Sequence, residues 1–348
     1  MESYATYGPE SEGFLASADL NGDGMLDLLA LNDGTLDIFF GQPDGGLGAP
    51  FTYPGGGPFG VGDLNGDGYP DVAMSFIEGG VVFPVQIYLN DGGGGLLPSG
   101  FVDAAQFVVG IGIGDLNDDG FADLVLAEGG FDGGLLLSST AEVAFGNGLG
   151  GFTAPVALPG LGFPLVVADL NQDGLADIAA NTSDGSQLAV LINQGDGGFR
   201  TTLYPTSALG EGNIALLPHA GGPPDLVLGD TGFDNAGIDF GGGIQVLENL
   251  GDGTFAIGPN LQAPGGTYLA IGDFNGDCIP DIATSGVGAS VLYGDGDGGF
   301  APAVKLQADG SAGTLAVLGP VENPRALAGE TDGYIAAGII VYGDASQP

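Results

Sequence analysis

The chain has 348 residues, of which 72 are glycine, 22 are proline and 44% are hydrophobic. So much glycine and proline would suit a disordered chain, but this apolar content favours a packed core, and short strands joined by tight turns are expected. The 44 acidic residues face 3 basic ones, and the net charge of −41 excludes binding to nucleic acids or anionic lipid surfaces, which requires Lys and Arg.

This charge should attract cations, although adaptation to salt or a need for solubility would also account for part of it. Cys278 is the single cysteine, so no internal disulfide can form. No apolar run approaches the length of a membrane span, so membrane insertion is not expected. The first residues lack the basic and apolar regions of a signal peptide. A cytoplasmic location stays open, but we expect the mature segment of a secreted or cell-surface protein.

Taken in chain order, five segments share the nine-residue pattern Asp-x-Asn-x-Asp-Gly-x-x-Asp, with Cys278 replacing the glycine in the last. They are residues 19–27, 63–71, 115–123, 169–177 and 273–281. Two degenerate copies have lost the preceding acids and contain Pro224-Asp225 and Pro324-Arg325. The repeat loops therefore start near residues 19, 63, 115, 169, 217, 273 and 317.

Each repeat carries the same succession of apolar bursts and turns. In the fourth, strands are expected at 165–168, 177–180, 188–192 and 201–204, with the acidic loop after the first and a glycine-rich turn after the third. Four strands in about 40–54 residues are typical of a propeller blade, whereas an open β-helix has much shorter repeats. The chain is therefore predicted to be all-β, a seven-bladed β-propeller with four-stranded antiparallel blades, forming one domain over residues 1–348.

The two ends of the chain suggest how the ring closes. The last repeat stops after its third strand, at 339–344, and residues 3–9 resemble the outer-strand segment 50–54. We therefore predict that residues 3–7 complete the last blade, which would remove exposed sheet edges. A frayed N-terminus beside a three-stranded last blade is the alternative.

The acidic pattern suits a hard cation. Side chains at positions 1, 3 and 5 converge as the loop curls, the sixth residue permits the turn, the seventh offers a carbonyl, and the final carboxylate closes the shell of oxygens that Ca²⁺ prefers. The predicted side-chain ligands are Asp19, Asn21, Asp23, Asp27, Asp63, Asn65, Asp67, Asp71, Asp115, Asn117, Asp119, Asp123, Asp169, Asn171, Asp173, Asp177, Asp273, Asn275, Asp277 and Asp281. The predicted main-chain carbonyl ligands are those of Met25, Tyr69, Phe121, Leu175 and Ile279.

A single acidic loop could be a turn without metal, since Asp, Asn and Gly favour turns, but five copies in register favour about five Ca²⁺ sites. Stability should then depend on calcium. Cys278 should strain its turn, because a positive φ is costly for a residue with a side chain. No metal is expected in the fifth and seventh repeats. In the seventh repeat, Arg325 could supply a fixed positive charge in place of the cation.

The acidic loops, with Gly-Gly-Phe-Thr-Ala-Pro at 150–155 and Gly-Gly-Phe-Ala-Pro at 298–302 in support, resemble the FG-GAP family of integrin-α-like, VCBS-type repeats. The resemblance implies a seven-bladed propeller with calcium between the first and second strands of a blade. It also implies adhesion, protein or carbohydrate recognition, or an accessory role.

Catalysis is not expected. His219 is the single histidine, and no nucleophile elbow, phosphate-binding loop or zinc motif appears. Paired carboxylates leave a glycosidase open, and a polysaccharide lyase or an accessory domain of such an enzyme is a further alternative.

We predict a monomeric binding or adhesion module that recognises a protein or a glycan. Its contacts would lie on long loops at 76–83, 128–135 and 230–240, on the face opposite the calcium loops. The candidate contact residues are Phe76, Phe83, Phe131, Phe233 and Phe240. Each of these aromatic side chains could instead pack back onto the blades.

Overall fold

The computed structural model describes most of the chain, with gaps mainly at the ends and in some connections. The described residues are 4–5, 15–32, 34–43, 46–78, 81–82, 84–132, 135–195, 198–205, 213–219, 222–230, 243–263, 268–286, 288–306, 315–320, 327–328 and 339–343. Everything regular in them is β-structure.

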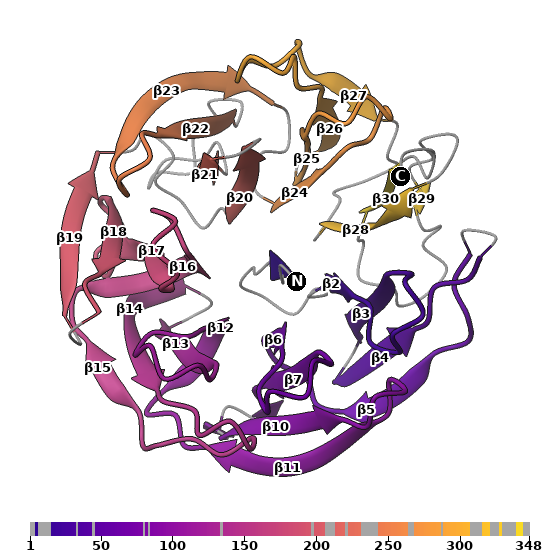
Figure 1. Cartoon of the computed structure of the whole chain (residues 1–348), viewed down its shortest axis with the longest axis vertical. Coiled ribbons are helices and arrows are strands. Elements are labelled where there is room, and N and C mark those ends of the chain that lie inside the picture. Colours follow the sequence, from indigo (N-terminus) through magenta and orange to yellow (C-terminus); the bar gives the residue numbers. More distant parts are fainter. Residues whose placement is uncertain are drawn as a thin grey trace.

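Six antiparallel sheets stand around a common axis as the blades of a β-propeller, with their inner strands toward the axis and their outer strands at the rim (Figure 1). From the inner to the outer strand, blade 1 consists of β2 (Leu15–Ala18), β3 (Asp27–Asn32), β4 (Thr35–Phe39) and β5 (Phe51–Pro54). Blade 2 consists of β6 (Phe59–Gly62), β7 (Asp71–Met74), β10 (Val85–Asn90) and β11 (Leu96–Val102). Blade 3 consists of β12 (Phe107–Gly114), β13 (Asp123–Asp132), β14 (Leu135–Ala144) and β15 (Val156–Leu158). Blade 4 consists of β16 (Leu161–Ala168), β17 (Asp177–Thr182), β18 (Leu188–Asn193) and β19 (Phe199–Tyr204). Blade 5 consists of β20 (Ile214–His219), β21 (Gly222–Asp230), β22 (Gly243–Asn249) and β23 (Phe255–Gln262). Blade 6 consists of β24 (Tyr268–Gly272), β25 (Asp281–Gly286), β26 (Gly288–Leu292) and β27 (Val304–Leu306).

The hydrophobic core lies between neighbouring blades. One cluster joins blades 3 and 4 through Val125, Leu165 and Ile178, and comparable clusters lie between the other successive pairs of the six blades. A sheet covered on both faces needs apolar side chains on both, which is why second and third strands such as β18 are buried throughout. Near the axis the blades converge, and glycine makes room: a Cβ on Gly112 would lie 2.5 Å from a methyl carbon of Val167.

The prediction of seven four-stranded blades is wrong in number, because the described residues form six. The seventh repeat supplies β28 (Leu315–Pro320), β29 (Leu327–Ala328) and β30 (Ile339–Gly343), a three-stranded sheet in which β28 and β30 are parallel. This repeat lacks both the acidic loop and the aspartate at its ninth position, where Arg325 stands, so its sequence does not specify a regular antiparallel blade. β28 nevertheless contacts both β24 and β2, so this small sheet lies between blade 6 and blade 1 (Figure 1).

The predicted closure by an N-terminal outer strand is also wrong. β1 (Tyr4–Ala5) pairs with β2, the inner strand of blade 1, and lies near the axis of the ring (Figure 1). Pairing with a strand that follows shortly along the chain costs less loop-closure entropy than pairing with the far end.

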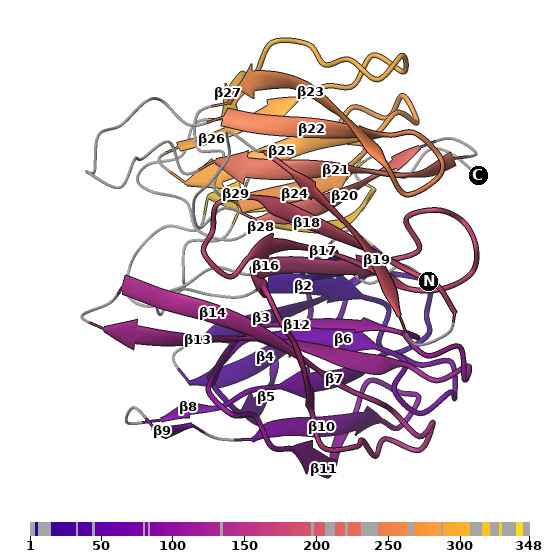
Figure 2. The same cartoon turned by 90° about the vertical axis from the view of Figure 1, so that its left-hand side faces the viewer.

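Loops on the two faces of the ring differ in regularity. On one face, here called the acidic face, all six turns between third and fourth strands carry the same bond from an N–H to a carbonyl four residues later. On the opposite face, β7 and β10 are joined through a small ribbon of β8 (Ile77–Glu78) and β9 (Val81–Val82), and β13 and β14 extend as a long hairpin (Figure 2). Residues 128–135, predicted to be a loop, are therefore mostly strand.

Candidate metal centre and the opposite face

The second residue of each acidic loop anchors that loop in the core. Leu20, Leu64, Leu116, Leu170 and Phe274 hold this position and are at most 3% exposed. In each case the main-chain N–H of this residue donates to the aspartate at position 9. The apolar side chain and this bond together fix where the loop leaves the inner strand.

The ninth residue, here called the anchor aspartate, is the first residue of the second strand and is completely buried in all five loops. Asp27 accepts from the N–H groups of Leu20 and Gly41, both at 2.8 Å. The equivalent second donors, at the end of the third strand, bond Asp71, Asp123, Asp177 and Asp281 at 2.7–2.8 Å. The anchor aspartate thus ties the acidic loop to the third-strand end and holds both on the same face.

Burial raises the pKa of these carboxyl groups, to about 6 for Asp71, Asp123, Asp177 and Asp281, and above its ordinary value for Asp27. The two main-chain N–H bonds oppose the rise, whereas the carboxylates at positions 5 and 1 of the same loop add to it. Positive charge in the loop would relieve this repulsion.

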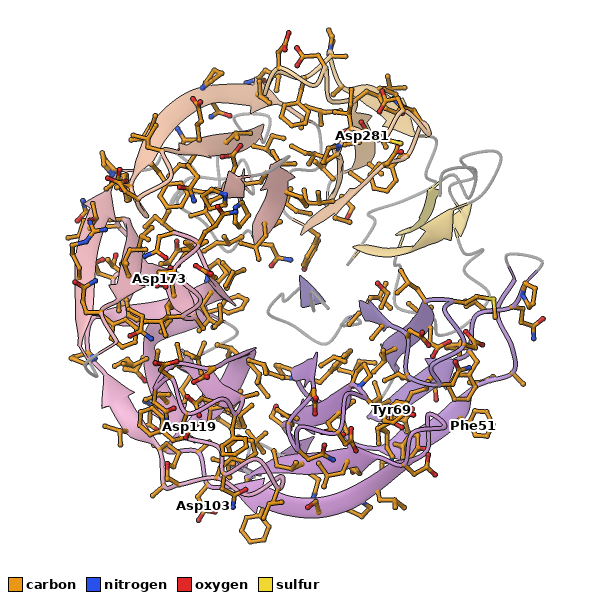
Figure 3. All side chains as sticks on the ribbon, viewed as in Figure 1. Phe51, Tyr69, Asp103, Asp119, Asp173 and Asp281 are labelled. Atoms are coloured by element: carbon orange, nitrogen blue, oxygen red, sulfur yellow. The ribbon has the colours of Figure 1, made fainter. Side chains whose placement is uncertain are left out.

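The first, third and fifth side chains organise the exposed part of the loop. Asp19 accepts from the N–H groups of Gly22, Asp23 and Gly24 at 2.8–3.1 Å. Asn21 accepts from the N–H of Asp23 and donates to its carboxylate, both at 3.0 Å. The same pattern recurs around the ring, where Figure 3 marks Asp119 and Asp173 at successive blades.

Each of the five loops turns through left-handed backbone at positions 4 and 6. Glycine holds most of these positions, but Asp118 (φ 59°), Gln172 (φ 60°) and Cys278 (φ 65°) adopt the same conformation. They are the non-glycine residues with positive φ among those described. The strain predicted for Cys278 is therefore present, and its thiol is exposed.

The donor set fits a hard cation by its chemistry, since every side-chain group is a carboxylate or amide oxygen. Carboxylate oxygens have two lone pairs each, so the bonds accepted by Asp23 and Asp27 leave capacity for a metal ion. Within the described ranges, no three carboxylate, imidazole or thiol groups already converge as a formed metal-holding group. Calcium binding thus stays a prediction from these loops.

The predicted carbonyl ligands at position 7 belong to residues whose side chains cover the neighbouring glycine-rich turns. A Cβ on Gly92 would lie 3.0 Å from the ring of Tyr69, and one on Gly296 would lie 3.1 Å from Ile279. Met25, Phe121 and Leu175 lie in the same way against Gly41, Gly148 and Gly195.

Blade 5 shows what survives without the acidic ligands. Leu217 pairs with Asp225, as Ala168 pairs with Asp177, but in blade 5 the pairing continues to His219 and Gly222, so strand pairing takes the place of part of the loop that blade 4 has at 169–176. Alignment of the repeats at Asp225 predicts His219 at the asparagine position, but His219 lies at the end of β20 and pairs with Gly222. Asp225 is buried and still accepts the N–H of Asn249 at 2.7 Å, so the anchor is kept where the other acids are lost. Arg325 lies outside the described residues.

On the opposite face, the ends of the blades contain buried polar atoms that have no hydrogen-bond partner. Among the described residues these are Ser75 Oγ, Glu128 Oε2, both amide atoms of Asn213 and Gln245 Oε1. Ser75 follows the second strand β7, and Glu128 lies in the second strand β13, in both cases away from the acidic loop. Asn213 and Gln245 lie at or near the starts of β20 and β22, which begin at that face. Such atoms are rare in folded proteins, and sequence patterns gave no signal for them.

Of the five aromatic residues predicted to contact a ligand, Phe76 and Phe131 lie among the described residues. Phe76 is half-buried and packs against the cluster between blades 1 and 2, with Met74. Phe131 lies on the extended strand β13. Phe83, Phe233 and Phe240 lie outside the described residues.

Sequence reasoning missed three asparagines at the ends of third strands, Asn90, Asn193 and Asn249, whose side chains reach the preceding blade. A possible signal was that each stands directly before a glycine-rich turn, at Asn90-Asp-Gly, Asn193-Gln-Gly and Asn249-Leu-Gly.

Two stretches of the sequence, residues 19–74 and 63–126, match the FG-GAP-like repeat. These stretches therefore consist of FG-GAP-like repeats, as the acidic loops predict. No curated protein matches the sequence. No helix among the described residues is long and apolar enough to cross a membrane.

Two solved structures share the propeller fold. A lectin from Agrocybe aegerita that recognises non-reducing terminal N-acetylglucosamine is 19% identical, with 85% of this chain and 80% of the lectin covered and a TM-score of 0.55. BBS1N, solved in complex with ARL6DN, is 15% identical, with 87% and 84% covered and a TM-score of 0.51. At these identities the similarity is one of fold alone.

Proposed function

We propose that this propeller with FG-GAP-like repeats is a calcium-stabilised binding or adhesion module without catalytic activity, which recognises a protein or a glycan through the face opposite its acidic loops. The observation that carries the proposal is the set of buried, unpartnered polar atoms of Ser75, Glu128, Asn213 and Gln245 near that face. Leaving such atoms unpaired costs about 1–3 kcal/mol each, and polar groups of a ligand could supply the partners.

The proposed calcium sites are the five acidic loops. Oxygens at positions 1, 3 and 5, with the carbonyl at position 7 and the anchor aspartate, would hold the ion, and the bound ion supplies positive charge among these carboxylates. We expect about five ions per chain, from the five loop copies, and a melting temperature that rises in calcium and falls in chelator. Metal counting and thermal unfolding test this; an absence of bound metal together with melting indifferent to chelator would refute it.

The proposed ligand is tested first with a glycan array, with and without chelator. Terminal N-acetylglucosamine is included because the fungal lectin of similar fold recognises it. A pull-down from secreted and surface proteins of the source cells tests for a protein partner.

Once a ligand is found, Gln245→Ala and Asn213→Ala should weaken binding by about tenfold or more, the equivalent of one lost hydrogen bond to a buried group. The control is Thr201→Ala, an exposed position on the outer strand β19, which should bind normally. If all three variants bind the ligand equally well, the ligand does not bind at the opposite face.

One observation favours the alternative of a carbohydrate-active enzyme. Burial and the neighbouring carboxylate of Glu142 raise the pKa of Glu128 to about 7, a value suited to a general acid. Polysaccharide cleavage that is lost in Glu128→Gln would establish this alternative. Glu128 is 1% exposed, so a substrate could reach it only after the same rearrangement of this face that a ligand of the proposed binding site needs.

We further propose that the protein acts as a monomer, outside the cell or on its surface. Light scattering of the purified protein tests the first point, and fractionation of the source cells tests the second.

A further inference from the structure

We propose that Asn90 and Asn193 are positioning residues that couple neighbouring acidic loops in pairs, so that calcium bound in one loop of a pair strengthens binding in the other. This inference rests on the proposed calcium sites. The coupled pairs are the loops of blades 1 and 2 and the loops of blades 3 and 4. The loop of blade 6 binds independently of both pairs.

Each of these asparagines bridges two blades with one buried amide group. The Nδ2 of Asn193, in blade 4, donates to the carbonyl of Leu116 in the acidic loop of blade 3 at 2.8 Å, and to Ala176 in its own loop at 3.2 Å. Asn193 is 2% exposed, so water does not compete for these bonds. Asn90 makes the same two contacts, to Leu20 of blade 1 at 2.7 Å and to Pro70 at 2.9 Å.

The bridged carbonyl lies next to a predicted ligand. The carbonyl of Leu116 belongs to the peptide group that leads into Asn117, while the N–H of Leu116 donates to the anchor Asp123 at 2.9 Å. The orientation of this part of the blade 3 loop is therefore fixed from its own blade and from blade 4.

The same asparagine is also tied to its own acidic loop. The main-chain N–H of Asn193 donates to the anchor Asp177 at 2.7 Å, and Asp177 accepts from Leu170 in the blade 4 loop at 2.9 Å. A continuous path of buried hydrogen bonds thus runs from Leu170 through Asp177 and Asn193 to Leu116. Asn90 forms the corresponding path between Asp71 and Leu20.

The bridges do not run around the whole ring. In blades 1, 3 and 6 the position of the asparagine is held by Gly41, Gly146 and Gly294, which bond the anchor aspartate but have no side chain to reach the preceding blade. A Cβ on Gly146 would lie 2.1 Å from the carbonyl oxygen of Ala122, so an asparagine cannot replace it without a backbone shift. The loops of blades 2 and 3 are therefore not bridged. Asn249 connects the blade 4 loop to blade 5, which has no acidic loop.

The physical basis of the coupling is shared ordering. When one loop of a pair is fixed, its anchor aspartate and the bridging asparagine are fixed with it, and the neighbouring loop then loses less conformational entropy on binding. Coupling between sites in proteins typically changes affinity about 5–150-fold, so we expect at least about fivefold here.

The test is a calcium titration followed by hydrogen exchange and mass spectrometry, which gives a separate midpoint of protection for each loop. Asp119→Ala removes an exposed ligand of the blade 3 loop. In the otherwise unchanged chain it should move the midpoint of loop 169–177 to at least about fivefold higher calcium, following the coupling estimate. In the Asn193→Gly background, which introduces the residue found naturally in three blades, the shift should fall below about twofold.

Two controls belong to the same experiment. Asn249→Gly breaks a bridge of the same kind that joins no second acidic loop, so the response of loop 169–177 to Asp119→Ala should persist. Loop 273–281 should keep its midpoint in every variant.

A second comparison needs no change at a bridging residue, in case Asn193→Gly does not fold. Asp67→Ala should shift the midpoint of loop 19–27, to which Asn90 bridges, and leave loop 115–123 unmoved. Calcium-dependent protection without these selective shifts overturns the coupling alone. If no loop of the unchanged chain gains protection in calcium, both the coupling and the proposed calcium sites are wrong.

Discussion

At the scale of single residues, one residue type has two roles in the same loop. The aspartates at positions 1 and 5 are accessible and organise the turn, whereas the anchor aspartate is buried and joins two strands of a blade. Sequence reasoning gave all of them a metal-binding role and missed the additional structural role of the anchor aspartate, because a pattern of identical side chains does not reveal burial. Asp225, kept in a repeat without the other acids, was the sequence sign that the ninth position has a structural role.

The structural role of the anchor aspartate gives a prediction that distinguishes a contribution to the fold from a contribution to metal binding. Asp225→Ala leaves the buried N–H of Asn249 without its acceptor and should cost about 1–3 kcal/mol of unfolding free energy, equally in calcium and in chelator. Asp173→Ala, at an exposed position of the blade 4 loop, should destabilise the protein in calcium only. Urea unfolding in both conditions measures this. A calcium-dependent effect of Asp225→Ala would contradict the anchor role.

Glu128 predicts a pH dependence. Burial first, and then the Glu142 carboxylate, raise its pKa from 4.5 to about 7, so the folded state binds a proton that the unfolded state releases. The stabilisation from this proton is fully present below pH 4.5, falls as the pH rises toward 7 and is absent above it. Glu128→Gln mimics the protonated group and should be more stable than the unchanged chain above pH 7, by about 3 kcal/mol at most.

Unfolding of both proteins in urea between pH 4 and pH 9 is the measurement. Their difference isolates Glu128 from the other carboxyl groups that titrate in this range. A difference that does not grow between pH 4.5 and pH 7 would rule out a raised pKa for Glu128.

At the scale of elements, tyrosines on outer strands fasten one blade to the next at the rim. The hydroxyl of Tyr204, on β19 of blade 4, accepts from the N–H of Phe255 in blade 5 at 2.9 Å, and the two rings meet edge to face with centroids 6.0 Å apart. Tyr53 of blade 1 accepts from Leu96 of blade 2 in the same way. The outer strands are thus held to their neighbours as well as to their own sheets.

Tyr204→Phe keeps the ring contact and removes the acceptor of a buried N–H, so it should lower the unfolding free energy by about 1–2 kcal/mol. Leu203, the neighbour of Tyr204, is half exposed, and Leu203→Thr should change stability by less than about 0.5 kcal/mol. Chemical denaturation of both variants tests this, and equal effects would argue against an inter-blade role for the hydroxyl.

The elements themselves were largely predictable. The acidic loop, with one apolar burst before it and two after it, predicted the first three strands of the regular blades, because each burst is short and ends at a turn residue. The extended β13–β14 hairpin was not recognised, since Gly129 and Gly130 were interpreted as loop residues although they pair with β14. The bridging asparagines could not be found from local patterns, because their partners lie 70 to 79 residues earlier in the chain.

At the scale of the whole molecule, the number of blades was the main error. Counting repeats gave seven, but the last copy has lost both the acidic loop and an anchor aspartate, which Arg325 replaces in the sequence. Without these groups nothing in that copy specifies the hairpin between its first and second strands. Repeat counting therefore overestimates regular blades where the anchor position is lost.

The charge of −41 predicts how the whole fold responds to salt. In chelator, raising NaCl from about 10 mM to about 0.5 M should raise the melting temperature, because screening weakens the repulsion among carboxylates. In calcium the same change should have a smaller effect, because ions in the proposed calcium sites would offset part of the charge. Differential scanning calorimetry measures both; a melting temperature indifferent to salt in chelator would show that this repulsion does not limit stability.

The retention of Asp225 has a consequence for how such a chain can change over time. Because blade 5 forms with the buried Asp225 and without the other acids, the exposed acidic residues of a loop can be lost without opening the ring. A lineage could therefore change how many of the proposed calcium sites the molecule carries while the propeller architecture stays the same.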